Sequence, residues 1–339
     1  MTQLATTPGL ALLQMINGYQ VSQAIAAAAA LRLADFVTHA PATAADVAAR
    51  AGTSPRPTYR LLRALASVGI FDESQDQRFT ANDLSQLLRS DTPGSLQGWA
   101  AFIGTALHRE MWGDLAHSVE TGQDAARHLH GASIWDLRAG RPEDNAIFNR
   151  AMASLSGPVI PAVLEAYDFN RFDHIVDVGG GNGTLLAGIL GANAHPRGTV
   201  FDLLHVVSAA EQVLTGAGVR DRCEAVPGSF FEDPVPAGAD AYILKNVIHD
   251  CSDDDSLTIL RNIRGVMRRD GRVLVIERLV SAPGGNPIGT FSDLNMLVAT
   301  GGQERTTEEW RELLASAGLS LVSVTATSAS AFIIEAEAV

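Results

Sequence analysis

The sequence is poor in cysteine, in basic residues and in long hydrophobic runs. Its two cysteines, Cys223 and Cys251, do not form a C-x-x-C pair and are too few for a disulfide framework, which favours a reducing, cytoplasmic location. Acidic residues outnumber basic ones by 38 to 25, and a net charge of −13 argues against nucleic acid or an anionic membrane as a partner. The apolar stretch at residues 24–33 is far too short to span a bilayer.

The composition indicates a globular protein. Of the 339 residues, 46% are hydrophobic and 19% are charged, which excludes a disordered chain. This length is sufficient for two domains, each with its own core.

A glycine-rich turn at residues 177–184 lies between a strand-like and a helix-like apolar run. This order brings the backbone close to a ligand, because glycine lacks Cβ and adopts positive φ easily. The dinucleotide pattern G-x-G-x-x-G does not fit, since its last position falls on Thr184 or Leu186. The pattern D-x-G-x-G-x-G fits, with Asp177, Gly179, Gly181 and Gly183. It is similar to the loop of S-adenosylmethionine-dependent methyltransferases.

The C-terminal half alternates strand and helix patterns. Strands are expected at residues 175–178, 199–202, 223–226, 241–244, 272–277, 320–325 and 332–337. The last two are separated by a short segment, so they should form an antiparallel pair. Seven strands with helical crossovers predict a doubly wound, Rossmann-like α/β sheet.

The N-terminal region is mainly helical and contains a helix-turn-helix pattern. Two short helices are expected within residues 43–68, the first capped by Thr43 and Asp46, and strand-like segments follow within residues 70–80, an order typical of a winged helix. Taken alone, the pattern suggests a regulator that binds DNA through Arg56, Arg60 and Arg63. The acidic chain and the glycine turn favour a winged helix used for packing. Further on, residues 131–141 are expected to form a loop, and a break between two helices is expected at residues 157–158.

Polar residues follow the second and third expected strands. Asp202 closes the second strand about 20 residues after the glycine turn, where doubly wound folds place a carboxylate on ribose hydroxyls. Ser229 and Phe230 follow the third strand, where an aromatic ring could lie against adenine and a hydroxyl could bond its edge. The alternatives are a solvated aspartate and an ordinary loop.

The fourth expected strand ends in Lys245 and leads to His249 and Asp250. Ligands of open α/β sheets bind at the carboxyl ends of strands, and a histidine there suits general base catalysis near neutral pH. Taken alone, a helix-capping or surface role fits His249 better.

Several motifs occur together in a fixed order along the chain. They are Asp-Val-Gly-Gly-Gly-Asn-Gly-Thr, Phe-Asp-Leu, Gly-Ser-Phe-Phe-Glu-Asp-Pro, Leu-Lys-Asn-Val-Ile-His-Asp and Gly-Gly-Gln-Glu-Arg-Thr. As a set they resemble the small-molecule O-methyltransferases related to plant caffeate and bacterial polyketide O-methyltransferases. The resemblance covers nearly the whole chain, including the winged helix, which serves dimerisation in that family.

The resemblance implies a homodimer that uses S-adenosyl-L-methionine, without a metal, to methylate a small hydroxylated molecule. We expect a winged-helix dimerisation domain at residues 1–105 and a helical connector contributing to the substrate pocket at residues 106–165. The catalytic domain should follow at residues 166–339. The acidic run at residues 253–255 resembles a metal cluster, but it starts an expected helix, where carboxylates favour the helix dipole.

The resemblance also implies roles for individual residues. The cofactor contacts are expected at Asp177, Gly179, Gly181, Asp202, Ser229, Phe230 and Lys245. His249 corresponds to the catalytic base, and Glu277 and Glu304 correspond to the acidic residues that flank it. The chain departs from the family pattern at Ser229, where Asp is common, at Cys251, where Trp is common, and at Leu204, where Pro is usual.

The sequence offers candidate residues for a substrate pocket. An apolar, aromatic-sized pocket is suggested by Trp99, Met111, Trp112, Phe148, Met152, Asp250, Asn295 and Met296. The open alternatives are transfer to nitrogen or carbon on the same fold, a ligand-sensing winged-helix regulator and a nicotinamide-dependent oxidoreductase.

Overall fold

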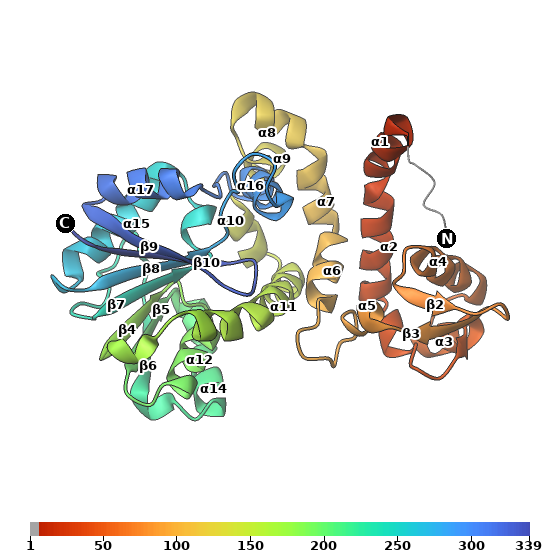
Figure 1. Ribbon diagram of the computed structural model, residues 1–339, viewed down its shortest axis with the longest axis horizontal. Helices are drawn as coiled ribbons and strands as arrows, with labels where there is room; N and C mark the ends of the chain where they lie inside the picture. Colours follow the sequence, from red (N-terminus) through yellow and green to blue (C-terminus); the bar gives the residue numbers. More distant parts are fainter. Residues whose placement is uncertain (1–6) are drawn as a thin grey trace. The chain divides into compact units, whose positions relative to one another are not determined.

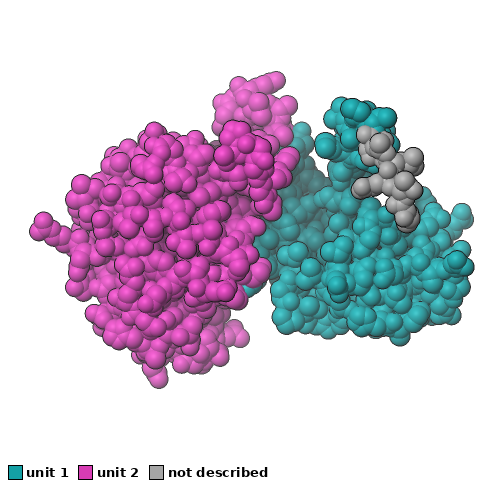
Figure 2. Space-filling view, in the orientation of Figure 1, with its two compact units in different colours: residues 1–113, 135–157 teal, residues 114–134, 158–339 magenta. Residues whose placement is uncertain are grey.

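The computed structural model describes residues 7–339. It consists of two compact units, coloured separately in Figure 2. Unit 1 comprises Met1–Gly113 and Trp135–Gly157, and unit 2 comprises Asp114–Ile134 and Pro158–Val339. The expected connector at residues 106–165 is therefore shared between the two units, and the predicted three-part division stays a prediction.

Unit 2 contains a seven-stranded sheet with the order β6-β5-β4-β7-β8-β10-β9 (Figure 1). Its strands are β4 (His174–Val178), β5 (Arg197–Asp202), β6 (Cys223–Pro227), β7 (Ala241–Lys245), β8 (Arg272–Glu277), β9 (Leu319–Ala326) and β10 (Phe332–Ala338). The first five are parallel, and β10 is antiparallel to both β8 and β9. The predicted doubly wound sheet and its antiparallel last pair are confirmed. The strand order reverses beside β4, so the ligand crevice of such a fold belongs at the ends of β4 and β7.

Helices cover both faces of this sheet, as the apolar parallel strands require. One face packs against α15 (Asp253–Val266) and α17 (Thr307–Ser316), and the other against α12 (Thr184–Ala192) and α14 (Ala210–Gly216) (Figure 1). Within β4, Val176 and Val178 enter the first core and Ile175 the second, in the alternation of a strand buried on both sides. The two cores hold the strand ends, and hence the site, in fixed positions.

Unit 1 combines helices with a small antiparallel sheet of order β1-β3-β2. The strands are β1 (Ala42–Thr43), β2 (Phe71–Glu73) and β3 (Arg78–Ala81), and the helices beside them are α3 (Ala44–Ala51) and α4 (Pro55–Ser67). Thr43 and Asp46 form the expected capping box at the start of α3. These are the elements that a winged helix requires, and that interpretation stays a prediction.

The remaining helices complete the two units. They are α1 (Pro8–Ile16), α2 (Gly18–Ala30), η1 (Leu33–Asp35), α5 (Asp83–Gln86), α6 (Gln97–Ile103), α7 (Ala106–Gly113), α8 (Leu115–Thr121), α9 (Ala125–His130), α10 (Ile134–Ala139), α11 (Pro142–Ala166), η2 (Phe169–Arg171), α13 (Leu204–Val207), η3 (Arg220–Arg222), η4 (Ile248–Asp250) and α16 (Pro287–Ala299).

Two expectations for the helices were wrong. Residues 131–141 were expected to form a loop but contain α10, whose first residue Ile134 is buried. A helix break was expected at residues 157–158, yet α11 continues through Pro158. Buried residues on both sides of the proline, Ala151 and Val163, anchor the two halves of the helix, so packing outweighs the local cost of proline.

Helix α11 also has the length and apolar composition of a membrane span, with a mean hydropathy of 1.2 over its most apolar window. Of that window, 17% is buried inside the protein, and two prolines interrupt it. It is the one such helix among the described residues, which is weak support for a span. The absence of a membrane partner stays a prediction.

Gly98 is required for close packing of α6 against α11 in unit 1. A Cβ at this position would lie 2.6 Å from the carbonyl oxygen of Arg150. Gly98→Ala should therefore lower the free energy of unfolding by about 1–3 kcal/mol through overpacking. Gly113→Ala, a helical position with open space around it, is the matched control and should be neutral or mildly stabilising. Thermal melts followed by circular dichroism test this, and equal melting temperatures for the two variants would contradict it.

Candidate active site

The glycine turn lies directly after β4 and shapes the crevice. Gly179, Gly181 and Gly183 have φ values of 69°, 62° and 76°, which side-chain-bearing residues rarely adopt. A Cβ at Gly179 would also lie 2.8 Å from a methyl carbon of Val247. The backbone of this turn thus stays accessible to a ligand and packs closely against the segment after β7.

Asp202 at the end of β5 is hydrogen-bonded to this turn. Its Oδ2 accepts from the backbone N–H of Gly181 at 2.8 Å, and its Oδ1 accepts from that of Leu203 at 2.7 Å. Burial raises the pKa of Asp202, although both hydrogen bonds oppose the rise. Each oxygen retains a lone pair, so the carboxylate can still accept from a diol.

Asp177, at the end of β4, is a buried carboxyl group beneath the glycine turn. It is 1% exposed, and neither carboxylate oxygen has a hydrogen-bond partner among the described residues. Burial raises its pKa to about 7, opposed by the positive charge of Lys245. Lys245, the only lysine in the sequence, has its own pKa lowered by burial. A carboxylate without a hydrogen-bond partner, below an accessible glycine backbone, is electrostatically suited to a cationic ligand such as an aminoacyl sulfonium nucleoside.

Phe230 and Ser229 lie on the loop after β6. The Phe230 ring is 3.5 Å from where a Cβ of Gly179 would stand, so it faces the glycine turn. The Ser229 hydroxyl accepts from the N–H of Phe231 at 3.2 Å, and the Ser229 N–H donates to Asp233 at 2.8 Å. Ser229 therefore stabilises the loop, and its expected contact with adenine stays a prediction.

His249 lies in η4, after an unusual turn at the end of β7. Asn246 adopts a positive φ of 54°, which asparagine tolerates better than most residues. The His249 ring is buried, with its Nδ1 3.0 Å from Oε1 of Glu304 and its Nε2 3.8 Å from Asp250. Glu277, at the end of β8, accepts the backbone N–H groups of Val247 and His249 at 3.1 Å each. The structure thus brings the three predicted catalytic residues together.

The three groups titrate very differently. Burial alone would lower the pKa of His249, but Asp250, Glu277 and Glu304 raise it to about 9. Burial raises the pKa of Glu277 to about 7 despite the nearby histidine. Burial also acts to raise the pKa of Glu304, yet hydrogen bonds from His249 and Ser292 hold it below its ordinary value. Near neutral pH, Glu304 is therefore the ionised partner of an imidazolium.

Sequence reasoning missed several residues around this cluster. Ser292 on α16 donates to Glu304 Oε1 at 2.7 Å, and Arg278 donates to the Ser292 hydroxyl at 3.3 Å. Asp293 accepts the backbone N–H of Glu304 at 3.0 Å. The sequence pointed to only one of these residues: Arg278 directly follows Glu277, a predicted catalytic residue.

The ligand atoms of His249, Glu277 and Glu304 all lie within 4.8 Å of one another, a spacing that a metal ion could use. Their hydrogen bonds already occupy the Nδ1 of His249 and one oxygen of each carboxylate. Asp253, in the acidic run, starts α15 and accepts a hydrogen bond from Arg305 at 2.6 Å. The expectation of a metal-free site stays a prediction.

The predicted substrate residues fall in both units. Unit 1 holds Trp99, Met111, Trp112, Phe148 and Met152, and unit 2 holds Asp250, Asn295 and Met296. In unit 1, Trp99 and Phe148 belong to an aromatic cluster centred on Phe102. The buried guanidinium of Arg138 lies 3.6 Å from the Phe148 ring centroid. Met111 is 1% exposed and serves the core, and substrate contacts of all these residues stay predictions.

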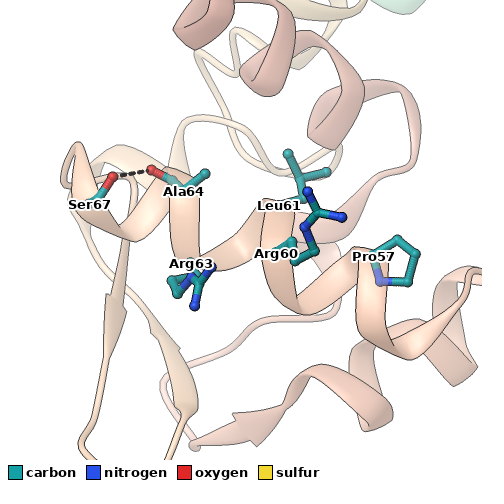
Figure 3. Close-up of a pocket in the computed structure, with 6 residues that line it drawn as sticks. All are labelled: Pro57, Arg60, Leu61, Arg63, Ala64 and Ser67. Atoms are coloured by element: carbon teal, nitrogen blue, oxygen red, sulfur yellow. Dashed lines mark hydrogen bonds between the residues drawn. The ribbon is translucent and has the colours of Figure 1, made fainter.

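The basic face weighed for DNA binding forms a shallow groove on α4. The groove has a volume of about 670 Å³. Its lining residues, drawn in Figure 3, are Pro57, Arg60, Leu61, Arg63, Ala64 and Ser67. The Arg63 guanidinium lies over the Tyr59 ring at 5.3 Å. This groove holds no titratable cluster comparable with the one around His249.

Comparisons with known proteins identify the family of the chain. A family described as the O-methyltransferase domain matches residues 112–320, and the O-methyltransferase dimerisation domain matches residues 13–91. The chain belongs to the O-methyltransferase family. It is a methyltransferase of the S-adenosylmethionine-dependent class, and the predicted family and fold are confirmed.

Relatives match over almost the whole chain. The phenazine O-methyltransferase PhzM of Lysobacter antibioticus is 42% identical over 96% of this chain and 95% of its own. The mitomycin biosynthesis 6-O-methyltransferase of Streptomyces lavendulae is 39% identical over 90% and 87%. The crystal structure of LaPhzM has a TM-score of 0.91 at 40% identity and covers 98% of this chain and 100% of that one. That of NcsB1, with S-adenosylmethionine and 2-hydroxy-5-methyl naphthoic acid, has a TM-score of 0.80 at 35% identity, covering 94% and 96%.

His108, in the aromatic cluster, makes unit 1 sensitive to acid. Burial and the charge of Arg138 lower its pKa to about 4, below the value of about 6.5 in an unfolded chain. The unfolded state therefore binds the proton more tightly, so stability present above pH 6.5 is lost as the pH falls towards 4.

His108→Gln should reduce this loss by on the order of 1–3 kcal/mol between pH 7 and pH 4.5. The exposed His39→Gln is the control and should follow the parent protein. Chemical denaturation at both pH values measures the difference. Parallel pH profiles for His108→Gln and the parent would show that His108 is not responsible.

Proposed function

We propose that this protein transfers the methyl group of S-adenosyl-L-methionine to a hydroxyl, most simply a phenolic one, of an aromatic small molecule. The observation that carries the proposal is a buried histidine beside the glycine turn, bonded through one ring nitrogen to an ionised carboxylate. The names of relatives support the acceptor class: one is a 2,7-dihydroxy-5-methyl-1-naphthoate 7-O-methyltransferase and another a 3-amino-4-hydroxybenzoate 4-O-methyltransferase.

The residues proposed to hold the cofactor surround the glycine turn. Asp202 would accept the ribose hydroxyls, Phe230 would lie against the adenine, and the orphaned Asp177 would face positive charge. Gly179 and Gly181 would let the backbone approach, and Lys245 would balance the buried carboxylate. The cofactor, when bound, supplies a methyl group activated by a sulfonium.

His249 is proposed as the general base. A phenol has a pKa near 10, so little of it is ionised at neutral pH. With Nδ1 bonded to Glu304, the proton of the hydroxyl would go to Nε2. Glu304 would stabilise the imidazolium, and Glu277 would hold the backbone of His249 in place through its N–H group.

The raised pKa of His249 has a consequence for this role. At a pKa of about 9 the ring is protonated at pH 7 and cannot accept a proton. A cation bound in the crevice would lower this pKa by like-charge repulsion. Cofactor binding would therefore release a proton and prepare the base, and activity should favour alkaline pH.

Methyl transfer to nitrogen is the second candidate function. A relative that is 34% identical over 92% of this chain is an 8-amino-8-demethylriboflavin N,N-dimethyltransferase. An amine acceptor of low basicity needs less help from a base. The dependence of the rate on His249 separates the two functions.

The remaining proposals concern organisation. The family of the N-terminal region supports a homodimer. We propose further the division at residues 105 and 165, a cytoplasmic location, and a reaction without metal, nucleic acid or membrane. The predicted aromatic and methionine residues of unit 1 are proposed as substrate contacts, and so, separately, are Asp250, Asn295 and Met296 of unit 2.

A matched pair of variants tests the base. His249→Asn should lower kcat by about 10²–10⁴-fold and leave the affinity for S-adenosylmethionine nearly unchanged. Asp202→Ala should instead act on cofactor affinity. It should weaken S-adenosylmethionine binding about 10–100-fold by loss of charge-assisted hydrogen bonds. Calorimetry with S-adenosylmethionine and single-turnover methylation of a panel of phenols and arylamines supply both measurements.

Full activity of His249→Asn on a phenol of ordinary pKa would remove His249 as the base. Activity confined to arylamines, in parent and variant alike, would favour the N-methyltransferase. Equal cofactor affinity for Asp202→Ala and the parent would remove Asp202 from the site.

The exposed apolar residues of α1 and α2 test the homodimer. Leucine, methionine, isoleucine and tyrosine side chains there are exposed, at Leu10, Leu12, Leu13, Met15, Ile16 and Tyr19. A patch of this kind usually marks an interface. Light scattering should give twice the chain mass of 35.8 kDa, and the double variant Leu13→Glu, Ile16→Glu should shift it to the monomer. A monomeric parent protein at micromolar concentration would contradict the proposal.

A further inference from the structure

Glu304 makes all its side-chain hydrogen bonds through one oxygen. Oε1 lies 3.0 Å from His249 Nδ1 and accepts from the Ser292 hydroxyl at 2.7 Å. Oε2 is buried and has no partner among the described residues. The bond to histidine and the bond to serine therefore share the same lone-pair-bearing atom, and a change in one alters the other.

Ser292 extends this arrangement to a fourth residue. A hydroxyl has one proton to donate and can accept at the same time. Ser292 gives its proton to Glu304 and accepts from Nη1 of Arg278 at 3.3 Å. Arg278 follows β8, Ser292 lies on α16 and Glu304 precedes α17, so three separate segments of unit 2 meet at one carboxylate.

We propose that Ser292 and Arg278 are positioning residues for the reaction: through the hydrogen bond to Oε1 of Glu304 they draw off part of the negative charge that this carboxylate presents to His249 Nδ1. The proposal rests on the proposed role of His249 as the base. It concerns two residues that act on His249 only through Glu304.

The electrostatics around His249 give the direction of the effect. The charged groups that face His249 or its carboxylate partners are Asp250, Glu277, Asp293, Glu304, Lys245, Arg278 and Arg305. Arg278 and the Ser292 hydroxyl both lower the pKa of Glu304. Without them Glu304 is a less stabilised anion, and it favours the imidazolium more strongly.

The hydrogen bonds from Arg278 to Ser292 and from Ser292 to Glu304, called the relay below, therefore limit the rise in the pKa of His249. A base that holds its proton too tightly is not free to accept another at working pH. Loss of the Ser292 hydroxyl should raise the pKa of His249, whereas loss of a merely structural contact would let Glu304 move away and lower it. The direction in which the pKa of His249 changes therefore distinguishes a charge-withdrawing hydrogen bond from a merely structural contact.

The first test measures the histidine directly, without catalysis. The protein, with its nine histidines ¹³C-labelled at Cε1, is titrated by NMR, and the signal absent from His249→Asn identifies His249. Ser292→Ala should raise the His249 pKa by about 0.5–1 unit, part of the free energy of a hydrogen bond to a charged group. Ser292→Thr, which keeps the hydroxyl, should restore the parent value.

Two further variants act as controls on the same titration. Arg278→Gln should also raise the pKa, and Arg278→Lys should have a smaller effect because it keeps the charge. Ser118→Ala removes a hydroxyl on α8 that is more deeply buried than that of Ser292 and has no hydrogen-bond partner among the described residues. It should leave His249 unchanged. A His249 pKa that is unchanged or lower in Ser292→Ala would overturn the proposal.

The second test follows the reaction. With S-adenosylmethionine and the best phenol of the panel, Ser292→Ala should shift the acidic limb of the kcat/KM profile, which follows deprotonation of the base, to higher pH by the same amount. Ser292→Thr should reverse the shift. If the pKa rises but His249→Asn remains fully active, the relay stands and the base assignment fails. If His249→Asn is inactive and the Ser292→Ala profile is unmoved, the base assignment stands and the relay fails.

Discussion

The contact between His249 and Glu304 determines how closely the surrounding main chain must pack, because both side chains are buried. A buried ion is costly unless partners satisfy it, so the main chain must bring those partners close. At Gly302 the approach is so close that a Cβ would lie 2.0 Å from the His249 carbonyl oxygen. The same carbonyl accepts the Gln303 N–H at 2.9 Å. The absence of a side chain at Gly302, two residues before Glu304, is therefore a steric requirement of the pair.

The parallel sheet supplies what this pair needs. Its strands end at one edge, and the residues after β7 and β8 face each other there, so Glu277 can accept the N–H groups of the His249 segment. The apolar cores on the two faces of the sheet hold those strand ends rigid. The stability of the cores offsets the cost of keeping Asp177, Lys245 and the His249 cluster out of water.

The sequence predicted what depends on strand order and local spacing. Glycines with positive φ and the carboxylate Asp202 could be placed because they follow apolar runs of strand length. Ser292 and Arg278 could not be predicted, because their roles exist only once α16 lies against the segment that follows β8. The continuation of α11 through Pro158 was missed for a related reason: burial on both sides of the proline is a property of the packed chain.

The two carboxylates beside His249 differ in what they accept, and this difference determines the charge of the cluster. Glu277 accepts only backbone N–H groups, and burial leaves its pKa at about 7, so it carries a partial charge near neutral pH. Glu304 accepts from a hydroxyl and a histidine ring, with a guanidinium nearby, and stays ionised. Of these two carboxylates, Glu304 therefore presents a full negative charge to the imidazolium and Glu277 a partial one, in addition to the charge of Asp250 near Nε2. A full charge on Glu277 would bind the proton of the imidazolium more tightly still and oppose its exchange with a substrate.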